Sequence, residues 1–282
     1  MAGAPRAAAL LLGLAQASHP FPVAIVLALT ALVGIASGPA DAYRLALATL
    51  AMLLSQLAIG WSNDYLDREY DRAHRPEKPV PAGLVPARVL PPLTAAALAS
   101  AVAVGAALGP DVLGLLLAGT ACGLGYNLAL KRTPFSWAAY VLAFALLPAY
   151  VWAALDQFRG ELWWLYVVGA PLALAAHIAN TLPDLAEDAS SGQGGLVARL
   201  GRRRAIALLF GCLALPPAST ALTALWLEYA WRILLPALAG YAVFVSAAAT
   251  AYRSVARRNA SLAFRLIGVA AVLLASAWLA AV

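Results

Sequence analysis

Charged residues are scarce in this chain, because Asp, Glu, Lys and Arg make up only 11% of its 282 amino acids. A soluble domain carries about 25%. Hydrophobic residues account for 63% of the chain, and the mean hydropathy is +0.81. This composition excludes an ordinary soluble domain and predicts one all-α, polytopic membrane domain over residues 1–282.

Cysteine is almost absent as well. The two cysteines, Cys122 and Cys212, both lie inside apolar runs. In such a setting cysteine is usually a small buried hydrophobic residue, so we expect neither a disulfide nor a metal site from them. The net charge of +6 comes from arginine-rich segments, and we explain it by membrane topology rather than by nucleic-acid binding.

Nine apolar runs have about the 20 residues that a hydrocarbon core of about 30 Å requires. Lipid cannot hydrogen-bond an open backbone, so each run is expected to be an α-helix. Upstream of them, residues 6–17 are typical of a signal peptide or of an interfacial helix, and we favour the helix. The runs are residues 21–37, 45–62, 89–108, 112–130, 133–155, 162–182, 205–227, 233–252 and 261–282.

Basic residues are concentrated in alternate loops. Fourteen lie in segments 63–88, 131–132, 199–204 and 253–258, and Arg6 precedes the first run, whereas the other loops hold three. Loops rich in Lys and Arg stay in the cytoplasm. We therefore predict a multi-pass protein of the cell membrane with a cytoplasmic N-terminus and an external C-terminus.

Two acidic segments, 63–71 and 180–188, interrupt this pattern with the same Asn-x3-Asp-x3-Asp spacing. Residues four apart share one face of a helix. The repeat suggests two related halves that face each other across a cavity. The six residues are Asn63, Asp67, Asp71, Asn180, Asp184 and Asp188.

Carboxylates gathered at a membrane surface repel one another unless cations balance them. Mg²⁺ prefers a few carboxylate oxygens and shares its other positions with phosphate oxygens, so the pair of segments favours a diphosphate clamp. Nearby basic side chains, Arg72, Lys78, Lys131 and Arg132, would donate to the same oxygens. Because the carboxylates repel, removing one is expected to leave stability near wild type. The plainer alternative is two acidic, solvated loops.

These motifs resemble those of the UbiA-type intramembrane prenyltransferases. The resemblance rests on the two acidic segments, on Lys78-Pro79-Val80-Pro81-Ala82-Gly83, and on Tyr126-Asn127 before Lys131-Arg132, and it covers nearly the whole chain. It implies nine transmembrane helices around a central cavity that opens to the cytoplasmic side. It also implies Mg²⁺ as cofactor and an isoprenyl diphosphate as donor.

The resemblance also assigns roles to residues of this chain. Asp67, Asp71, Asp184 and Asp188 would be the catalytic, metal-binding residues. Apart from the resemblance, the position of His177 one turn before Asn180 suggests that it orients the acceptor or acts as a base, with a histidine satisfying a core hydrogen bond as the alternative. His19 at the first run could touch the acceptor, but we favour a helix start at the membrane interface as its role. The expected substrate-binding residues are Asn63, Asp64, Arg72, Lys78, Tyr126, Lys131, Asn180 and His177.

One departure from the family pattern follows the second acidic segment. Related sequences often read Gly-Lys-Arg-Thr where this chain has Gly192-Gln193-Gly194-Gly195. Two cations that would meet the diphosphate are missing, and Gln193 and Gly194 stand in their place. Either the glycines let backbone N–H groups bind the anion, or the donor is held more weakly.

The function that follows is Mg²⁺-dependent transfer of an isoprenyl group to a small acceptor, aromatic or a quinone precursor, within the lipid bilayer. A terpene cyclase that ionises the same donor without an acceptor is the alternative. A cation-coupled transporter is disfavoured, since transporter sites lie at mid-bilayer and these motifs lie at helix ends.

Overall fold

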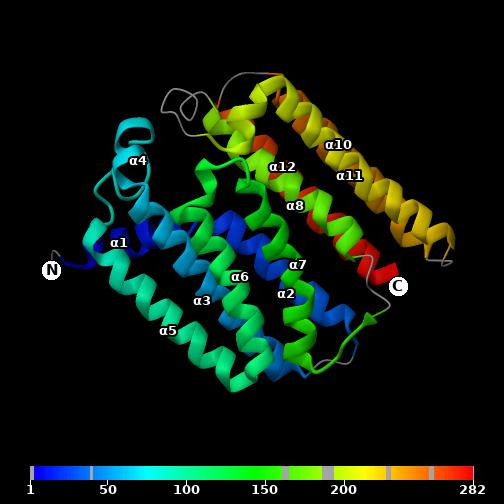
Figure 1. Cartoon of the computed structure of the whole chain (residues 1–282), viewed down its shortest axis with the longest axis horizontal. Coiled ribbons are helices and arrows are strands. Elements are labelled where there is room, and N and C mark those ends of the chain that lie inside the picture. Colours follow the sequence, from blue (N-terminus) through cyan, green and yellow to red (C-terminus); the bar gives the residue numbers. More distant parts are fainter. Residues whose placement is uncertain are drawn as a thin grey trace.

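The computed structural model describes residues 3–38, 41–160, 165–185, 194–226, 230–253 and 257–281, and Figure 1 shows how its helices are arranged. Over these residues helices are assigned and no β-strand is. The all-α class is therefore confirmed. The long helices are α1 (Gly3–Ala17), α2 (Pro20–Ala36), α3 (Ala42–Leu66), α5 (Leu90–Leu108), α6 (Pro110–Leu128), α7 (Ser136–Leu155), α8 (Leu165–Thr181), α10 (Leu196–Trp226), α11 (Trp231–Ala251) and α12 (Arg257–Ala281). The short ones are α4 (Arg68–His74), η1 (Ala87–Val89), η2 (Leu130–Arg132) and η4 (Leu182–Asp184).

Eight helices within the described residues are long and apolar enough to cross a membrane, and α1 with α2 gives a ninth if the bent pair is one span. Each predicted run coincides with one of the helices from α2 to α12. The helix expected upstream of the first run is α1, which is bent by 63° from α2.

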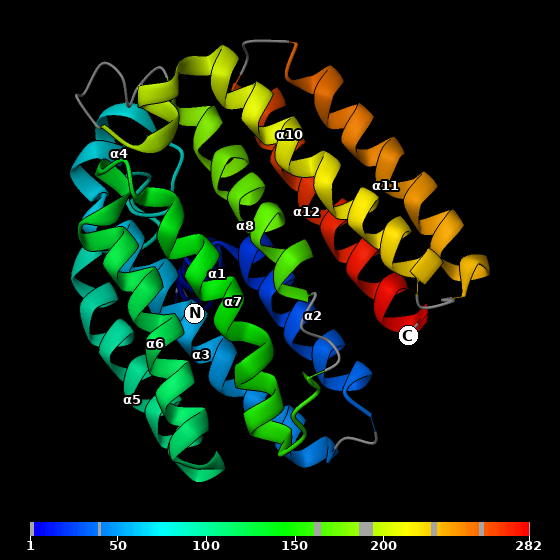
Figure 2. The ribbon, with the colours of Figure 1, turned by 45° about the vertical axis from the view of Figure 1, so that its right-hand side comes forward.

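The helices form two packed groups. Residues of α2, α3, α5, α6 and α7 supply most of one hydrophobic core, and α8, α10, α11 and α12 supply the other. Helix α12 packs against both α2 and α8, which joins the groups. Figure 2 shows α10 and α11 on the outside of the second group, while α4 and the η4 end of α8 lie at the same end of the molecule.

The corner between α1 and α2 is held against α3. His19 has a left-handed backbone conformation (φ 58°), and the next helix begins at Pro20. A Cβ on Gly60 would lie 2.6 Å from the carbonyl oxygen of Ser18, so only glycine lets the corner approach α3 this closely. The Trp61 indole N–H also donates to the carbonyl of Leu14, at 3.0 Å.

A cavity of about 630 Å³ lies between the two groups, lined by residues of α2, α3, α6, α7, α8 and α12. Its lining on α2 runs from His19 to Val33, about 20 Å along the helix axis. One end, called here the polar end, is lined by Asn63, Asp67, Lys131 and Asp184, and the lining toward Val33 is mostly aliphatic.

Candidate active site

The first acidic motif begins at the end of α3. Helix α3 stops at Leu66 and α4 starts at Arg68, but the amide of Asp67 still bonds to the carbonyl of Asn63 and that of Asp71 to Asp67. The three side chains therefore keep the helical spacing, as predicted. The Asn63 amide nitrogen donates to the Asp67 carboxylate, at 3.1 Å.

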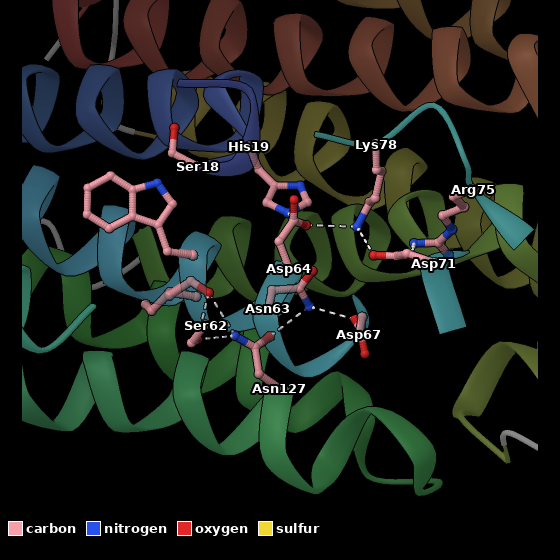
Figure 3. A network of polar contacts seen from close by, with 12 residues as sticks. Ser18, His19, Ser62, Asn63, Asp64, Asp67, Asp71, Arg75, Lys78 and Asn127 are labelled. Carbon is pink, nitrogen blue, oxygen red and sulfur yellow. Dashed lines mark hydrogen bonds and ion pairs between the residues drawn. The ribbon is translucent and has the colours of Figure 1, made fainter. Parts of the chain in front are cut away.

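Asn127 on α6 fixes the orientation of Asn63. Its Nδ2 donates to the carbonyl of Ile59 and to the Ser62 hydroxyl, so its Oδ1 is left to accept from Nδ2 of Asn63, at 3.2 Å. Figure 3 shows this chain of contacts. Because the Asn63 nitrogen makes both contacts, its amide oxygen is the atom that could bind a cation.

Lys78 balances two buried carboxylates. Its ammonium lies 2.9 Å from Asp64 Oδ1 and 2.8 Å from Asp71 Oδ2 (Figure 3). Burial alone would lower the pKa of Lys78, but the two carboxylates outweigh it and raise that pKa above its ordinary value. Asp64 and Asp71 are 2% and 1% exposed and lie behind the cavity wall, whereas Lys78 lines the cavity.

Arg75 joins the two acidic motifs. One guanidinium nitrogen lies 3.5 Å from Asp71 Oδ1, and another lies 2.6 Å from Asp184 Oδ2. The motifs are more than a hundred residues apart in the sequence. The structure therefore brings their carboxylates to opposite sides of a single guanidinium, as expected for halves that face each other.

Lys131 balances the remaining carboxylate of the first motif. It lies on η2 and pairs directly with Asp67. The turn that carries Lys131 packs closely against Gly194 and Gly195, called here the glycine segment. A Cβ on Gly195 would lie only 2.7 Å from the Lys131 carbonyl oxygen. Gly194 lies beside the carbonyl of Arg132. Gly195 thus has a packing role at the site, whereas Gln193 lies outside the described residues.

The described part of the second acidic motif lies on α8 and η4. The Asn180 amide donates to the hydroxyl of Tyr140 at 2.9 Å, and Asn180 and Asp184 both line the cavity. Pro183 has no N–H to continue the α-helix, and the chain tightens into η4 there. The fourth expected metal ligand, Asp188, lies outside the described residues.

Three expected substrate-binding residues do not line the cavity: Asp64, which lies behind its wall, Arg72 and His177. Arg72 pairs with Glu69 at 2.6 Å on the exposed side of α4. His177 is fully buried, 3.0 Å from the Ser136 hydroxyl, and its ring packs edge-on against Tyr126 and Tyr140. The alternative of a core histidine accounts for the Nε2 contact, whereas the buried Nδ1 has no hydrogen-bond partner among the described residues. Tyr126, in contrast, lines the cavity as expected.

Sequence reasoning missed Arg75 at the polar end, and it gave His19 only a minor place. Arg75 follows Asp71 by four residues, a spacing that brings opposite charges together on a helix, so a local signal existed. His19 lies 3.0 Å from Asp64 although the two are 45 residues apart. No local sequence pattern predicts the contact between His19 and Asp64.

The carboxylates suit a divalent cation by their chemistry, but the present placement of the described ones does not gather them into a metal site. No group of three or more acidic, His or Cys side chains could hold a metal as the described residues stand. Asp67, Asp71 and Asp184 are each held by a basic side chain instead. The donor set of carboxylate and amide oxygens is the kind that Mg²⁺ prefers, and its carboxylates face basic side chains in this structure.

Together the fold and the site define a polytopic helical membrane protein in which carboxylates and cations line one end of an apolar cavity. Residues 22–277 match the model of the UbiA prenyltransferase family. The chain belongs to this family and is a prenyltransferase.

Several relatives can be named. A digeranylgeranylglyceryl phosphate synthase of Methanoregula boonei is 28% identical over 191 residues, which cover 65% of this chain and 67% of the relative. One of Pyrococcus abyssi is 30% identical over 174 residues, covering 60% and 62%. A UbiA homologue of Archaeoglobus fulgidus, bound to GPP and Mg²⁺, shares the fold with a TM-score of 0.74 at 18% identity, over 95% of this chain and 99% of that one.

Proposed function

We propose that the protein transfers an isoprenyl group from a prenyl diphosphate to an acceptor in the membrane, with Mg²⁺ as cofactor. The observation that carries this proposal is the pairing of Asp71 and Asp184 through Arg75 at the polar end of an elongated apolar cavity. A prenyl diphosphate has the matching form, with a charged head and an apolar tail. The A. fulgidus homologue bound to GPP and Mg²⁺ supports the same donor class.

The metal would be held by Asp67, Asp71 and Asp184, with Asp188 as the fourth proposed ligand and the Asn63 and Asn180 amides beside them. Bound Mg²⁺ would supply Lewis acidity that stabilises the charge of the departing diphosphate. A ligand role for Asp71 requires it to move out from behind the cavity wall, where it now lies.

The basic side chains of the polar end have a second task in this reaction. Lys78, Arg75 and Lys131 now neutralise carboxylates. When metal ions take over that neutralisation, the same ammonium and guanidinium groups are free to donate to diphosphate oxygens. The aliphatic lining toward Val33 would bind the isoprenyl tail and keep water from the allylic cation.

Two acceptor classes are open to test. An aromatic acceptor or quinone precursor is the one that the sequence motifs favour. A lipid-like alcohol is the second candidate, because two relatives are named for the synthesis of digeranylgeranylglyceryl phosphate. In either case we propose that the polar end faces the cytoplasm.

The test is an assay of purified protein with geranyl, dimethylallyl or geranylgeranyl diphosphate, with Mg²⁺ or with EDTA. The acceptors are 4-hydroxybenzoate and geranylgeranylglyceryl phosphate. Metal-dependent formation of a prenylated acceptor is the expected result. Diphosphate release with a cyclised or hydrolysed hydrocarbon product, and no transfer to either acceptor, would instead identify a cyclase.

A further inference from the structure

The polar end of the cavity contains an imidazole that the reaction described above does not use. His19 lines the cavity, and its Nε2 lies 3.0 Å from Asp64 Oδ1 (Figure 3). Its side chain is 36% exposed, whereas Asp64 behind it is 2% exposed. A histidine backed by a buried carboxylate is the arrangement that orients and strengthens a general base.

The partners of Asp64 determine which nitrogen of His19 carries the proton. Asp64 Oδ1 also accepts from the Lys78 ammonium, at 2.9 Å, so Asp64 is an ionised acceptor. Nε2 of His19 must then donate to it. In the neutral ring this leaves Nδ1 with the lone pair, and therefore as the basic atom.

The backbone around His19 holds the ring in this place. The left-handed φ of 58° is uncommon for a residue with a side chain, and such strain is often retained at functional sites. Gly60 lets the corner rest on α3, and Asp64 follows one turn later on the same helix. The corner and its carboxylate partner are thus positioned by one helix face.

Other groups that line the cavity are poor bases for the acceptor. Asp67 and Asp184 are paired with cations and are the proposed metal ligands. Lys78, Arg75 and Lys131 are positively charged donors, and neutral phenols are not bases near pH 7. Of the three histidines in the chain, His177 does not line the cavity, and the ring of His74 contacts the backbone carbonyl of Tyr70.

We propose that His19 is the general base that takes the proton of a hydroxyl acceptor, an alcohol or a phenol, in the prenyl transfer. This assignment rests on the proposed function. The donor's C1–O bond breaks, and its electron pair leaves with the diphosphate. The acceptor oxygen forms the new bond to C1, and its proton passes to Nδ1 of His19. The imidazolium that results is stabilised by Asp64.

Two variants separate proton transfer from structure. His19→Gln keeps an amide N–H at the position of Nε2 and can still donate to Asp64, but it has no basic atom. His19→Gly removes the ring, and glycine adopts the left-handed backbone without strain. The assay uses geranylgeranyl diphosphate with geranylgeranylglyceryl phosphate or 4-hydroxybenzoate, and it follows donor consumption without acceptor alongside transfer.

Both variants should still bind donor and release diphosphate slowly without acceptor, with thermal stability near wild type. In both variants the rate of transfer should fall by about 100-fold, which is at the lower end of what a general base contributes. Imidazole added to the buffer should partly restore transfer in His19→Gly. Full transfer by His19→Gln would overturn the assignment and leave the hydrogen bond to Asp64 as the role of His19. Equal loss of donor consumption and transfer in both variants would overturn it too, by placing His19 in the donor site. A wild type that consumes no donor would overturn the proposed function itself.

Discussion

The two acidic motifs share one spacing but are held differently. In the first, Asp64 and Asp71 are almost fully buried and Lys78, from the same stretch of chain, lies between them. In the second, the Asp184 side chain is 18% exposed, and Arg75 reaches it from the first motif. Two cations that follow the first motif in the chain, Arg75 and Lys78, thus balance Asp64 and Asp71, and Arg75 extends to the second motif. Lys131 of η2 balances Asp67.

This difference shows how a carboxylate site can fold before any metal arrives. A buried charge needs a partner, and the segment from Asn63 to Lys78 contains both signs in a short length. The same cations are the donors that a diphosphate would need. Neutralising the site and recognising the substrate are therefore proposed as two tasks of one set of side chains.

The sharpest contrast is expected in membrane labelling, which tests whether both motifs lie on one side. In a background with Cys122→Ala and Cys212→Ala, cysteines at Ala73 and Gly194 should react with an impermeant maleimide only from the cytoplasmic face. A cysteine at Gln157 should react only from outside. Labelling of the first two from opposite faces would separate the motifs, and reversal of all three would invert the proposed orientation.

Removing one carboxylate from each motif should distinguish them by stability. Asp71→Asn and Asp184→Asn should both lower transfer by about 100-fold or more, if each carboxylate holds metal. Asp71→Asn removes one of the two carboxylates that face Lys78 and one of the two that face Arg75, which keep Asp64 and Asp184 respectively. It should therefore destabilise the protein by about 1–3 kcal/mol, whereas Asp184→Asn, at a more exposed site, should cost less. Thermal unfolding in detergent measures the difference. Equal stability losses would remove the distinction between the motifs.

That prediction corrects an expectation based on charge alone. From the sequence, repulsion among the carboxylates implied that losing one would leave stability unchanged. The structure shows Asp71 between Lys78 and Arg75 instead. Sequence patterns give opposite charges four residues apart, but they do not show which side chains are buried together.

The fold was largely predictable because the length and polarity of each apolar run follow directly from the membrane. That the two acidic motifs lie opposite each other was predictable from their repeated spacing. The contact of His19 with Asp64 depends on a bend between α1 and α2 and on the absence of a side chain at Gly60. Such contacts arise from tertiary packing, which periodicity does not encode.

The glycine segment after the second motif offers a smaller, matched test. In Gly195→Ala the new methyl group would meet the Lys131 carbonyl oxygen at 2.7 Å, and the backbone must shift. In Gly194→Ala the nearest atom is 3.4 Å away. We expect Gly195→Ala to cost about 1–3 kcal/mol and to raise the donor KM, since Lys131 moves, while Gly194→Ala stays near wild type. Equal KM values in both variants would mean that the segment does not position Lys131.

The smallest expected effect is the alkaline dependence of stability, which belongs to the first motif. The pKa of Lys78 is raised, because Asp64 and Asp71 outweigh the effect of burial. The folded protein therefore holds this proton more tightly than the unfolded chain does. The contribution of Lys78 to stability is complete below its ordinary pKa of about 10.4, and it is lost as the pH rises through the raised value.

Tyrosines also titrate in this range, so the informative quantity is the difference in unfolding temperature between wild type and Lys78→Met. That difference should stay constant up to about pH 10 and shrink only above it. Asp184→Asn should lose unfolding temperature at high pH as the wild type does. The ion pairs of Lys78 among the described residues are with Asp64 and Asp71, and Asp184 pairs with Arg75. A difference that already shrinks well below pH 10 would mean that burial lowers the pKa of Lys78. Asp64 and Asp71 would then need a cation other than Lys78 to balance them in the folded state.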